Sequence, residues 1–246
     1  MVVLWGMNPF GKYAKKRLVR LQSALQEFGH RSDPELIHQV RVEIKKLKAL
    51  LNLMGYSRKK FKSHETYIPF RTIHRASARI WEPVVMQRLL KQYAITIPNV
   101  NSTQEIEKFR SKIPKFVKAV RKGKQSILPS AKKVVKDDYR KYLKKKNRQV
   151  CDLITSGIPL RQLHLIRKQV KEVYYLLGIF KKRKQINPLL ARCDNLIGNW
   201  LDQKLVLAQL RKSNPKSRVI PLVQSQMKSG LKDIRTELKY FVSQNK

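Results

Sequence analysis

The chain has 246 residues, enough for one large domain or two small ones with a packed core. It contains 55 Lys and Arg against 16 Asp and Glu, a formal net charge of +39, and 42% of its residues are hydrophobic. The hydrophobic residues recur at helical spacing, which excludes global disorder, and the charge predicts a polyanionic partner such as nucleic acid, polyphosphate or an acidic membrane surface. A ribosome-like basic protein without a dedicated site is the alternative.

The sequence predicts a cytoplasmic protein without a membrane span. No stretch approaches 18 uninterrupted apolar residues, the length that indicates a transmembrane helix. The N-terminus has a short apolar start but lacks the basic region and the long apolar core of a signal peptide. The two cysteines, Cys151 and Cys193, are too few for a disulfide framework, so we expect reduced structural thiols.

Four helices are predicted in the first half of the chain, residues 12–124. They cover residues 12–28, 32–55 and 66–93, and a fourth begins at a capping box formed by Ser102 and Glu105 and carries an apolar row from residue 106 to residue 120. Proline is expected to break or kink the third helix at Pro83 and to bend the fourth at Pro114.

The second half, residues 129–246, follows a boundary predicted at residues 123–130. Its four helices are predicted at residues 130–155, from just after 159 to 177, at 187–210 and at 215–241. Basic connectors at residues 58–62 and 181–184 follow the second helix of each half, and no strand pattern competes. The predicted fold class is therefore all-α, with two antiparallel four-helix bundles.

The second helix of the first half carries the most informative pattern. Its apolar residues are spaced 3, 4, 3 and 4 apart and form one buried row: Ile37, Val40, Ile44, Leu47 and Leu51. One residue after each of the first four lies a basic one, which forms a stripe beside the row: His38, Arg41, Lys45 and Lys48. Ser32 and Glu35 have capping-box spacing, Pro34 suits the first turn, and Gly55 is expected to end the helix.

The same pattern occurs again in the second half. The apolar row repeats with identical spacing at Leu163, Ile166, Val170, Val173 and Leu177. The basic stripe repeats as His164, Arg167 and Lys171, whereas Tyr174 stands at the fourth position. A His-x-x-Arg-x-x-x-Lys stripe at the same phase of two apolar rows is improbable by chance and indicates an internal repeat.

These motifs resemble those of the conserved-histidine α-helical domain family, known as CHAD. The resemblance spans nearly the full length, and it implies two four-helix bundles related by pseudo-twofold symmetry, with a basic groove between them. It also implies binding of inorganic polyphosphate without catalysis, and an association with polyphosphate granules. The residues that match the family motif, and that we expect to bind polyphosphate, are His38, Arg41, Lys45, Lys48, His164, Arg167 and Lys171.

The family resemblance also covers an acid on the third helix of each half. It places Leu-Gly-x-x-(Arg/His)-Asp there, and this chain has Ile197 to Asp202 in the second half and Ser77 to Glu82 in the first. The acid is kept in both, but Trp81 and Leu201 occupy the basic position before it. We expect Glu82 and Asp202 to form ion pairs with the stripe cations, and simple surface acids are the alternative.

The chemistry of the stripe favours anion binding over catalysis. On a helix, residues i, i+3 and i+7 share a face, so His, Arg and Lys in this order can contact consecutive phosphate oxygens. A phosphate beside the imidazole would favour its charged form and raise its pKa. No pair of histidines has metal-ligand spacing, the acids are scattered, and no Gly-rich phosphate loop is present. We therefore expect no enzyme, no metal and no cofactor.

Other basic residues are second-choice contributors to binding. On the third helix these are Arg71, Arg75 and Arg79, and on the last helix they are Lys228, Lys232, Arg235 and Lys239. The runner-up function is non-specific RNA or DNA binding, for which charge alone suffices. Base stacking needs exposed aromatic residues, and only 8% of the chain is aromatic. The aromatic residues that keep this alternative open are Tyr139, Tyr142, Tyr174 and Tyr175.

Overall fold

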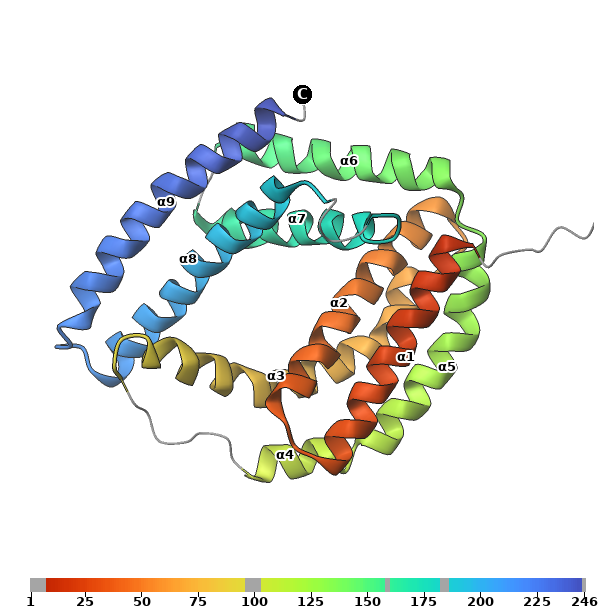
Figure 1. Ribbon diagram of the computed structural model, residues 1–246, viewed down its shortest axis with the longest axis horizontal. Coiled ribbons are helices and arrows are strands. Elements are labelled where there is room, and N and C mark those ends of the chain that lie inside the picture. The colour runs from red at the N-terminus through yellow and green to blue at the C-terminus, as the bar shows by residue number, and fades with distance from the viewer. Residues whose placement is uncertain (1–7, 96–102, 158–159, 182–185, 245–246) are drawn as a thin grey trace, which may run out of the picture. The chain divides into compact units, whose positions relative to one another are not determined.

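The computed structural model describes residues 8–95, 103–157, 160–181 and 186–244, except the side chain of Arg161. These residues form nine α-helices and one short 3₁₀ helix, η1, with no strand among them, which confirms the prediction of an all-α protein (Figure 1). The helices are α1 (Pro9–His30), α2 (Pro34–Ser57), α3 (Ser63–Lys91), α4 (Thr103–Arg110), α5 (Ile113–Lys132), α6 (Lys136–Thr155), α7 (Leu163–Leu177), α8 (Pro188–Ser213) and α9 (Val219–Ser243), and η1 (Leu160–Gln162) precedes α7. No helix in this part of the chain is long and apolar enough to cross a membrane.

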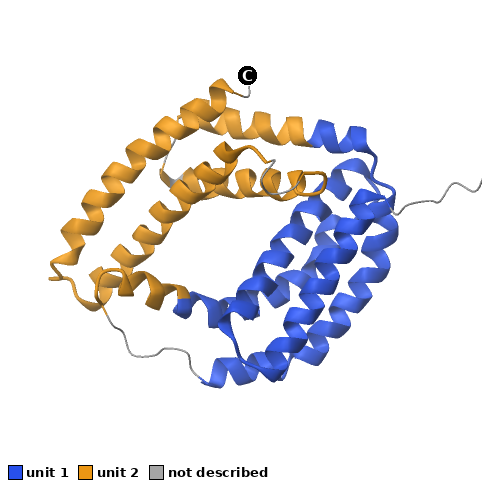
Figure 2. Cartoon of the chain, viewed as in Figure 1, with its two compact units in different colours: residues 1–84, 99–142 blue, residues 85–98, 143–246 orange. Residues whose placement is uncertain are grey.

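The chain divides into two compact units (Figure 2). Unit 1 consists of residues 1–84 and 99–142, and unit 2 consists of residues 85–98 and 143–246. Helices α3 and α6 each contribute to both units. This division differs from the predicted halves, because residues 85–98 belong to unit 2 and residues 129–142 belong to unit 1.

Unit 1 is built around α1, which packs along both α2 and α5 (Figure 1). The predicted apolar row of α2 is confirmed, since all five of its side chains are at most 1% exposed. On the side of α2 that faces α1, Arg17 donates from Nη1 to both carboxylate oxygens of Glu43, each at 3.1 Å. Lys46 donates to the same carboxylate at 2.9 Å. A buried charge cluster thus joins the first two helices.

The boundary predicted at residues 123–130 is wrong, because these residues are helical and lie within α5. Gly123 is there for packing: a Cβ atom on it would lie 2.7 Å from Cζ of Phe70, a fully buried side chain of α3. The glycine therefore permits a close approach of two helices rather than a turn. Helix α5 then ends at Lys132, so the predicted helix 130–155 is in fact α6, which begins at Lys136.

Three proline and capping predictions need correction. Pro114 does not bend a continuous helix but lies in the first turn of α5, where its missing N–H costs nothing, and α4 ends before it. The predicted break at Pro83 is wrong, because Pro83 lies inside α3, whereas a kink there stays a prediction. The cap of α2 is Asp33 rather than Ser32, since the Asp33 carboxylate accepts from the Glu35 N–H at 2.8 Å. Pro34 follows it as predicted, and Ser102 lies outside the described residues.

Gly55 also has a packing role, because α2 continues past it to Ser57. A Cβ atom at this position would lie 2.8 Å from Oγ of Ser63, at the start of α3. The predicted stop at Gly55 is therefore wrong, and the small residue instead lets the chain return closely after the turn.

Unit 2 has its own core, in which α7 packs on α8 and α8 packs on α9. The second apolar row is confirmed for its first four residues, which are buried, and Leu177 is half-buried. Cys193 lies in this core, where burial raises the pKa of its thiol to about 12. A separate apolar cluster joins the end of α3 to α8 and α9 around Leu90, Val206 and Val223.

A polar link between α6 and α7 repeats the one between α1 and α2. Lys146 of α6 donates to Gln169 at 3.0 Å and lies 3.7 Å from a carboxylate oxygen of Glu172. When His38 is aligned with His164, Gln169 corresponds to Glu43 and Glu172 to Lys46. In both units a cation of the preceding helix therefore binds the first of these two positions, Glu43 in unit 1 and Gln169 in unit 2.

Candidate anion-binding site

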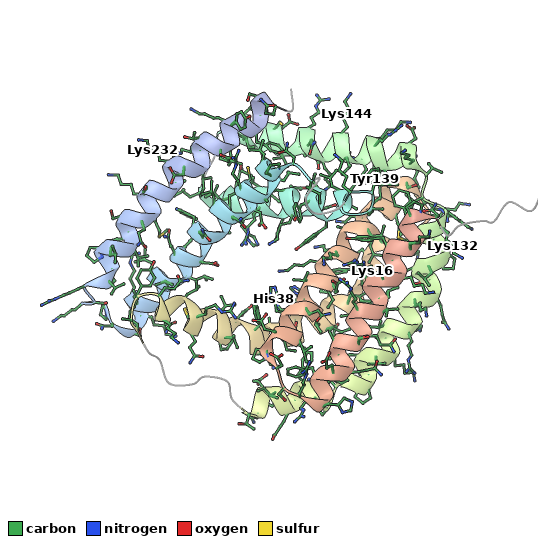
Figure 3. All side chains as sticks on the ribbon, viewed as in Figure 1. Lys16, His38, Lys132, Tyr139, Lys144 and Lys232 are labelled. Atoms are coloured by element: carbon green, nitrogen blue, oxygen red, sulfur yellow. The ribbon has the colours of Figure 1, made fainter. Side chains whose placement is uncertain are left out.

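The first basic stripe lies on α2 in unit 1, beside its buried apolar row. His38, Lys45 and Lys48 are exposed, and Arg41 is half-buried; Figure 3 labels His38. The one-residue step from row to stripe, about 100° around the helix, accounts for this placement. The structure therefore brings all four predicted residues of the first motif onto one accessible face.

Arg41 is held against α3 by neutral oxygens. Its Nη1 atom donates to the carbonyl of His74 at 3.0 Å and is 3.5 Å from Oγ of Ser77. Burial lowers the pKa of Arg41, and the opposing effect of Glu82 is smaller. An arginine remains charged at neutral pH despite such a shift, so these contacts orient the guanidinium without neutralising it.

His74 of α3 lies among the cations of the first stripe. Its pKa is lowered to about 4, first by burial and then by the positive charges of Arg41, Lys45 and Lys48. The imidazole is therefore neutral at physiological pH and contributes no charge of its own. The charges of three cations therefore act on one neutral side chain, which indicates a positive region on α2 and α3.

Two aromatic residues of α3 flank this region. The ring of Trp81 lies 4.6 Å from that of His38, centroid to centroid, at an interplanar angle of 36°. The ring of Tyr67 lies 5.1 Å from Nζ of Lys48, a cation–π distance. Our sequence interpretation had noted Trp81 only as a departure from the family motif. Trp81 follows Ser77 by four residues and His74 by seven, and this spacing in the sequence places the three side chains on one side of α3.

The second stripe lies on α7 in unit 2 and carries its own counter-ion. His164 is exposed, whereas the side chains of Arg167 and Lys171 are 27% and 28% exposed. Nε of Arg167 donates to one carboxylate oxygen of Asp194 at 2.8 Å, and Nζ of Lys171 lies 3.1 Å from the other. One carboxylate therefore binds both strong cations of the second motif.

Gly198 makes room for this arrangement. A Cβ atom on Gly198 would lie 2.6 Å from Nη2 of Arg167 and 3.0 Å from its Cζ. The guanidinium consequently packs directly on the backbone of α8. This contact gives a physical reason for a glycine in the middle of a long helix, where it costs roughly 0.5–1 kcal/mol relative to alanine.

The expected ion pairs of Glu82 and Asp202 with the stripe cations stay a prediction, although the charge of Glu82 acts on Arg41 and the charges of Arg167 and Lys171 act on Asp202. The ion pairs described for Arg167 and Lys171 go to Asp194, which the sequence interpretation missed, and Asp202 lies two turns further along α8. Burial raises the pKa of Asp202, partly opposed by Arg167 and Lys171, so it is near the stripe in a secondary position. Glu82 is exposed.

The third-helix residues that bind the two motif arginines are equivalent in sequence. The alignment that pairs Glu82 with Asp202 also pairs His74 with Asp194. Arg41 therefore binds the backbone carbonyl of His74, and Arg167 binds the side chain of the aligned residue, Asp194. The two motifs therefore share a contact between the motif arginine and this position of the third helix, and they differ in the charge of the residue at that position.

The second-choice basic residues of α3 and α9 are exposed. Arg75 and Arg79 line a hollow of about 180 Å³ with residues of α4, and Arg79 lies 3.6 Å from a carboxylate oxygen of Glu105. Arg71 and the four basic residues of α9 are also exposed, and Figure 3 labels Lys232 among them. Their contribution to binding stays a prediction.

The aromatic residues that kept nucleic acid open are mostly covered. Tyr139 and Tyr142 are buried, and burial raises the pKa of Tyr139 to about 12. Tyr174 and Tyr175 are half-buried and pack edge-on against each other, with centroids 6.2 Å apart. None of these four offers a fully open ring for stacking. In the residues that the structure describes, no three His, Cys, Asp or Glu side chains group as metal ligands.

Comparison of the chain with protein-family models, with curated proteins and with solved structures finds no match.

Proposed function

We propose that this protein binds inorganic polyphosphate through the basic stripes of α2 and α7, without transforming it, as the resemblance to the CHAD family implies. The predicted ligands of the phosphates are those of the two motifs, His38, Arg41, Lys45, Lys48, His164, Arg167 and Lys171. The resemblance further implies two pseudo-symmetric bundles with a basic groove between them, so that one long polyphosphate would contact both motifs.

The observation that carries the proposal is the cation cluster of the first motif. The charges of Arg41, Lys45 and Lys48 all act on the neutral imidazole of His74, and Arg41 donates to the His74 carbonyl and lies 3.5 Å from Oγ of Ser77. A cluster of like charges attracts an anion of the opposite sign. Arginine also offers a planar fork that matches two phosphate oxygens, and lysine adds a mobile charge.

The repeated link to the preceding helix supports the assignment of a duplicated motif. Arg17 binds Glu43 of α2, and Lys146 binds the aligned position, Gln169, of α7. These contacts lie outside the stripe, so they extend the similarity of the two copies beyond the residues that suggested it.

An anion without bases suits the site better than nucleic acid does. Four tyrosines flagged as stacking candidates are buried or half-buried, and the aromatic rings nearest the first stripe already pack on His38 and Lys48. A chain of phosphates needs only charge and hydrogen-bond donors, which the stripes supply.

The test is a competition at physiological salt between long-chain polyphosphate and single-stranded RNA of equal total charge. Polyphosphate is expected to displace RNA, and its affinity should fall with salt at a log–log slope of roughly −0.7 per phosphate neutralised. Replacing Arg41 and Arg167 together by Gln should weaken polyphosphate binding roughly tenfold or more, chiefly because the charge-assisted hydrogen bonds of Arg41 are lost.

The matched control replaces Arg20 and Arg148 by Gln, since both are exposed, one lies in each unit, and neither belongs to a stripe. This variant has the same net charge, and we expect its affinity to change less than about threefold, as for exposed charges acting at a distance. Thermal melts confirm that each variant is folded. Equal losses in the two double variants, or stronger binding of RNA, would favour a non-specific nucleic-acid binder instead.

A further inference from the structure

The two motifs differ in the charge that faces their arginine. At the aligned position of the third helix, the first unit has His74, which is neutral, and the second has Asp194, whose carboxylate contacts two cations. The first stripe also has a fourth cation, Lys48, where the second has Tyr174. The local positive charge is therefore larger in the first motif.

Asp194 occupies the donors that a phosphate would use. Its two carboxylate oxygens accept from Arg167 at 2.8 Å and from Lys171 at 3.1 Å, the geometry expected of charge-assisted hydrogen bonds. A phosphate group presents oxygens with similar spacing and the same sign. Both anions cannot take the same N–H groups, and their like charges repel when they approach.

We propose that Asp194 is an internal competitor for the anion at the second motif, which makes this motif the weaker of two unequal phosphate-binding sites. The inference rests on the proposed function and assigns a role to a residue outside the basic stripes. Polyphosphate engages the first motif first, and binding at the second requires the Asp194 carboxylate to give up Arg167 or Lys171.

The experiment measures binding of tripolyphosphate by calorimetry for the full chain and for the variant Asp194→Asn. Tripolyphosphate is short, so its affinity reports on individual sites rather than on a chain that spans both. Releasing Arg167 and Lys171 should tighten binding at the second motif roughly tenfold, the scale of one charge-assisted hydrogen bond. The control is Asp152→Asn, an exposed residue of α6 in the same unit, with the same change of charge and an expected effect below about twofold.

A thermodynamic cycle separates competition from general charge. Arg167→Gln should weaken binding only slightly in the wild-type chain, because Asp194 already engages this arginine, and should abolish most of the gain in the Asp194→Asn chain. Arg41→Gln should weaken binding in both chains, since the partners described for Arg41 are the neutral oxygens of His74 and Ser77.

The outcomes distinguish the inference from the function on which it rests. If the wild type binds and Asp194→Asn behaves like Asp152→Asn, the competitor role is rejected while polyphosphate binding stands. If only Asp194→Asn binds, the first motif is not a site, and both the proposed function of the wild type and the order of the two motifs are rejected. If no variant binds, both fail. A purely structural Asp194 would lower the melting temperature without any gain in affinity, which also rejects the inference.

Discussion

Units 1 and 2 contain the same motif, but the residue that faces the motif arginine is the neutral His74 in unit 1 and the acidic Asp194 in unit 2. Both motif helices bury the same apolar row, and both arginines bind the equivalent position of the third helix. In unit 1 the partner is a backbone carbonyl beside a neutral imidazole, and in unit 2 it is a carboxylate. The difference teaches that the third helix, and not the stripe alone, determines how much positive charge the motif offers to an anion.

The side of the motif helix that faces the preceding helix carries an acid in unit 1 and a neutral residue in unit 2. In unit 1 the carboxylate of Glu43 is buried toward α1, away from the stripe, where it compensates Arg17 and Lys46. In unit 2 the aligned residue is the neutral Gln169. Unit 1 thus keeps its acid on the structural side of α2, whereas unit 2 places an acid against the stripe. Each placement can be tested by removing the charge.

The largest expected effect is the loss of stability on replacing Glu43 by Gln. Glu43 is 2% exposed and Arg17 is 7% exposed, so the substitution leaves a buried guanidinium without its counter-ion. Breaking a buried ion pair from one side costs about 3–5 kcal/mol. For a chain of this length each kcal/mol lowers the melting midpoint by roughly 2–4 °C, so we expect a decrease of about 6–20 °C in a thermal melt.

The control for Glu43 is Glu65→Gln, because Glu65 also pairs with a lysine but is 63% exposed. An exposed pair contributes about 0–1 kcal/mol, so this variant should melt within roughly 3 °C of the wild type. Equal melting temperatures for the two variants would mean that the Arg17–Glu43 cluster is not a structural element of unit 1.

A smaller effect is expected in the pH dependence of stability that His74 confers. Its pKa is about 4 in the folded chain, against an ordinary value of 6.5, because of burial and the charges of Arg41, Lys45 and Lys48. The unfolded chain therefore takes up a proton between pH 6.5 and 4 that the folded chain does not. The neutral His74 contributes to the free energy of unfolding above pH 6.5, and this contribution is lost as the pH falls through this window. We expect a loss of about 1–2 kcal/mol at pH 5 after allowance for solvent screening.

Urea unfolding at pH 7.5 and pH 5 measures this loss. The variant His74→Gln cannot take up the proton, so it should lose less stability than the wild type over the same interval. His64→Gln provides the control, since His64 is exposed on the same helix. A pH dependence that is unchanged in His74→Gln would show that the three stripe cations do not act on this imidazole.

The rows and stripes were predictable because they depend on local helix geometry. A period of 3.6 residues decides which side chains share a face, so the burial of Ile37 or Val170 and the exposure of Lys45 follow from spacing alone. Composition and the absence of strand patterns likewise predicted an all-α chain. Each of these inferences needs only neighbours within two helical turns.

The residues that escaped prediction depend on contacts between distant segments. The sequence suggested a boundary at Gly123 because the residue that leaves no room for a side chain there, Phe70, lies 53 positions earlier in the chain. Asp194 was passed over for Asp202 because the rotation of α8 against α7 decides which of two acids, two turns apart, reaches Arg167. Asp33 and Ser32 are both good caps, and only the path of the backbone selects between them.

The smallest expected effect concerns Gly198 and sharpens the comparison of the two motif arginines. In unit 1 the position aligned with Gly198 is Ala78, so Arg41 already tolerates a Cβ atom there. In unit 2 a Cβ atom at residue 198 would force the Arg167 guanidinium to move, whereas one at Gly230 of α9 would meet its nearest atom at 4.0 Å. Gly230→Ala should therefore show the ordinary helix gain of about 0.5–1 kcal/mol, or roughly 1–4 °C in the melting midpoint. Gly198→Ala should gain less than this, because moving the guanidinium weakens its hydrogen bond to Asp194. The difference between the two midpoints measures how firmly Asp194 holds Arg167, and equal gains would show that this arginine is free to leave without cost.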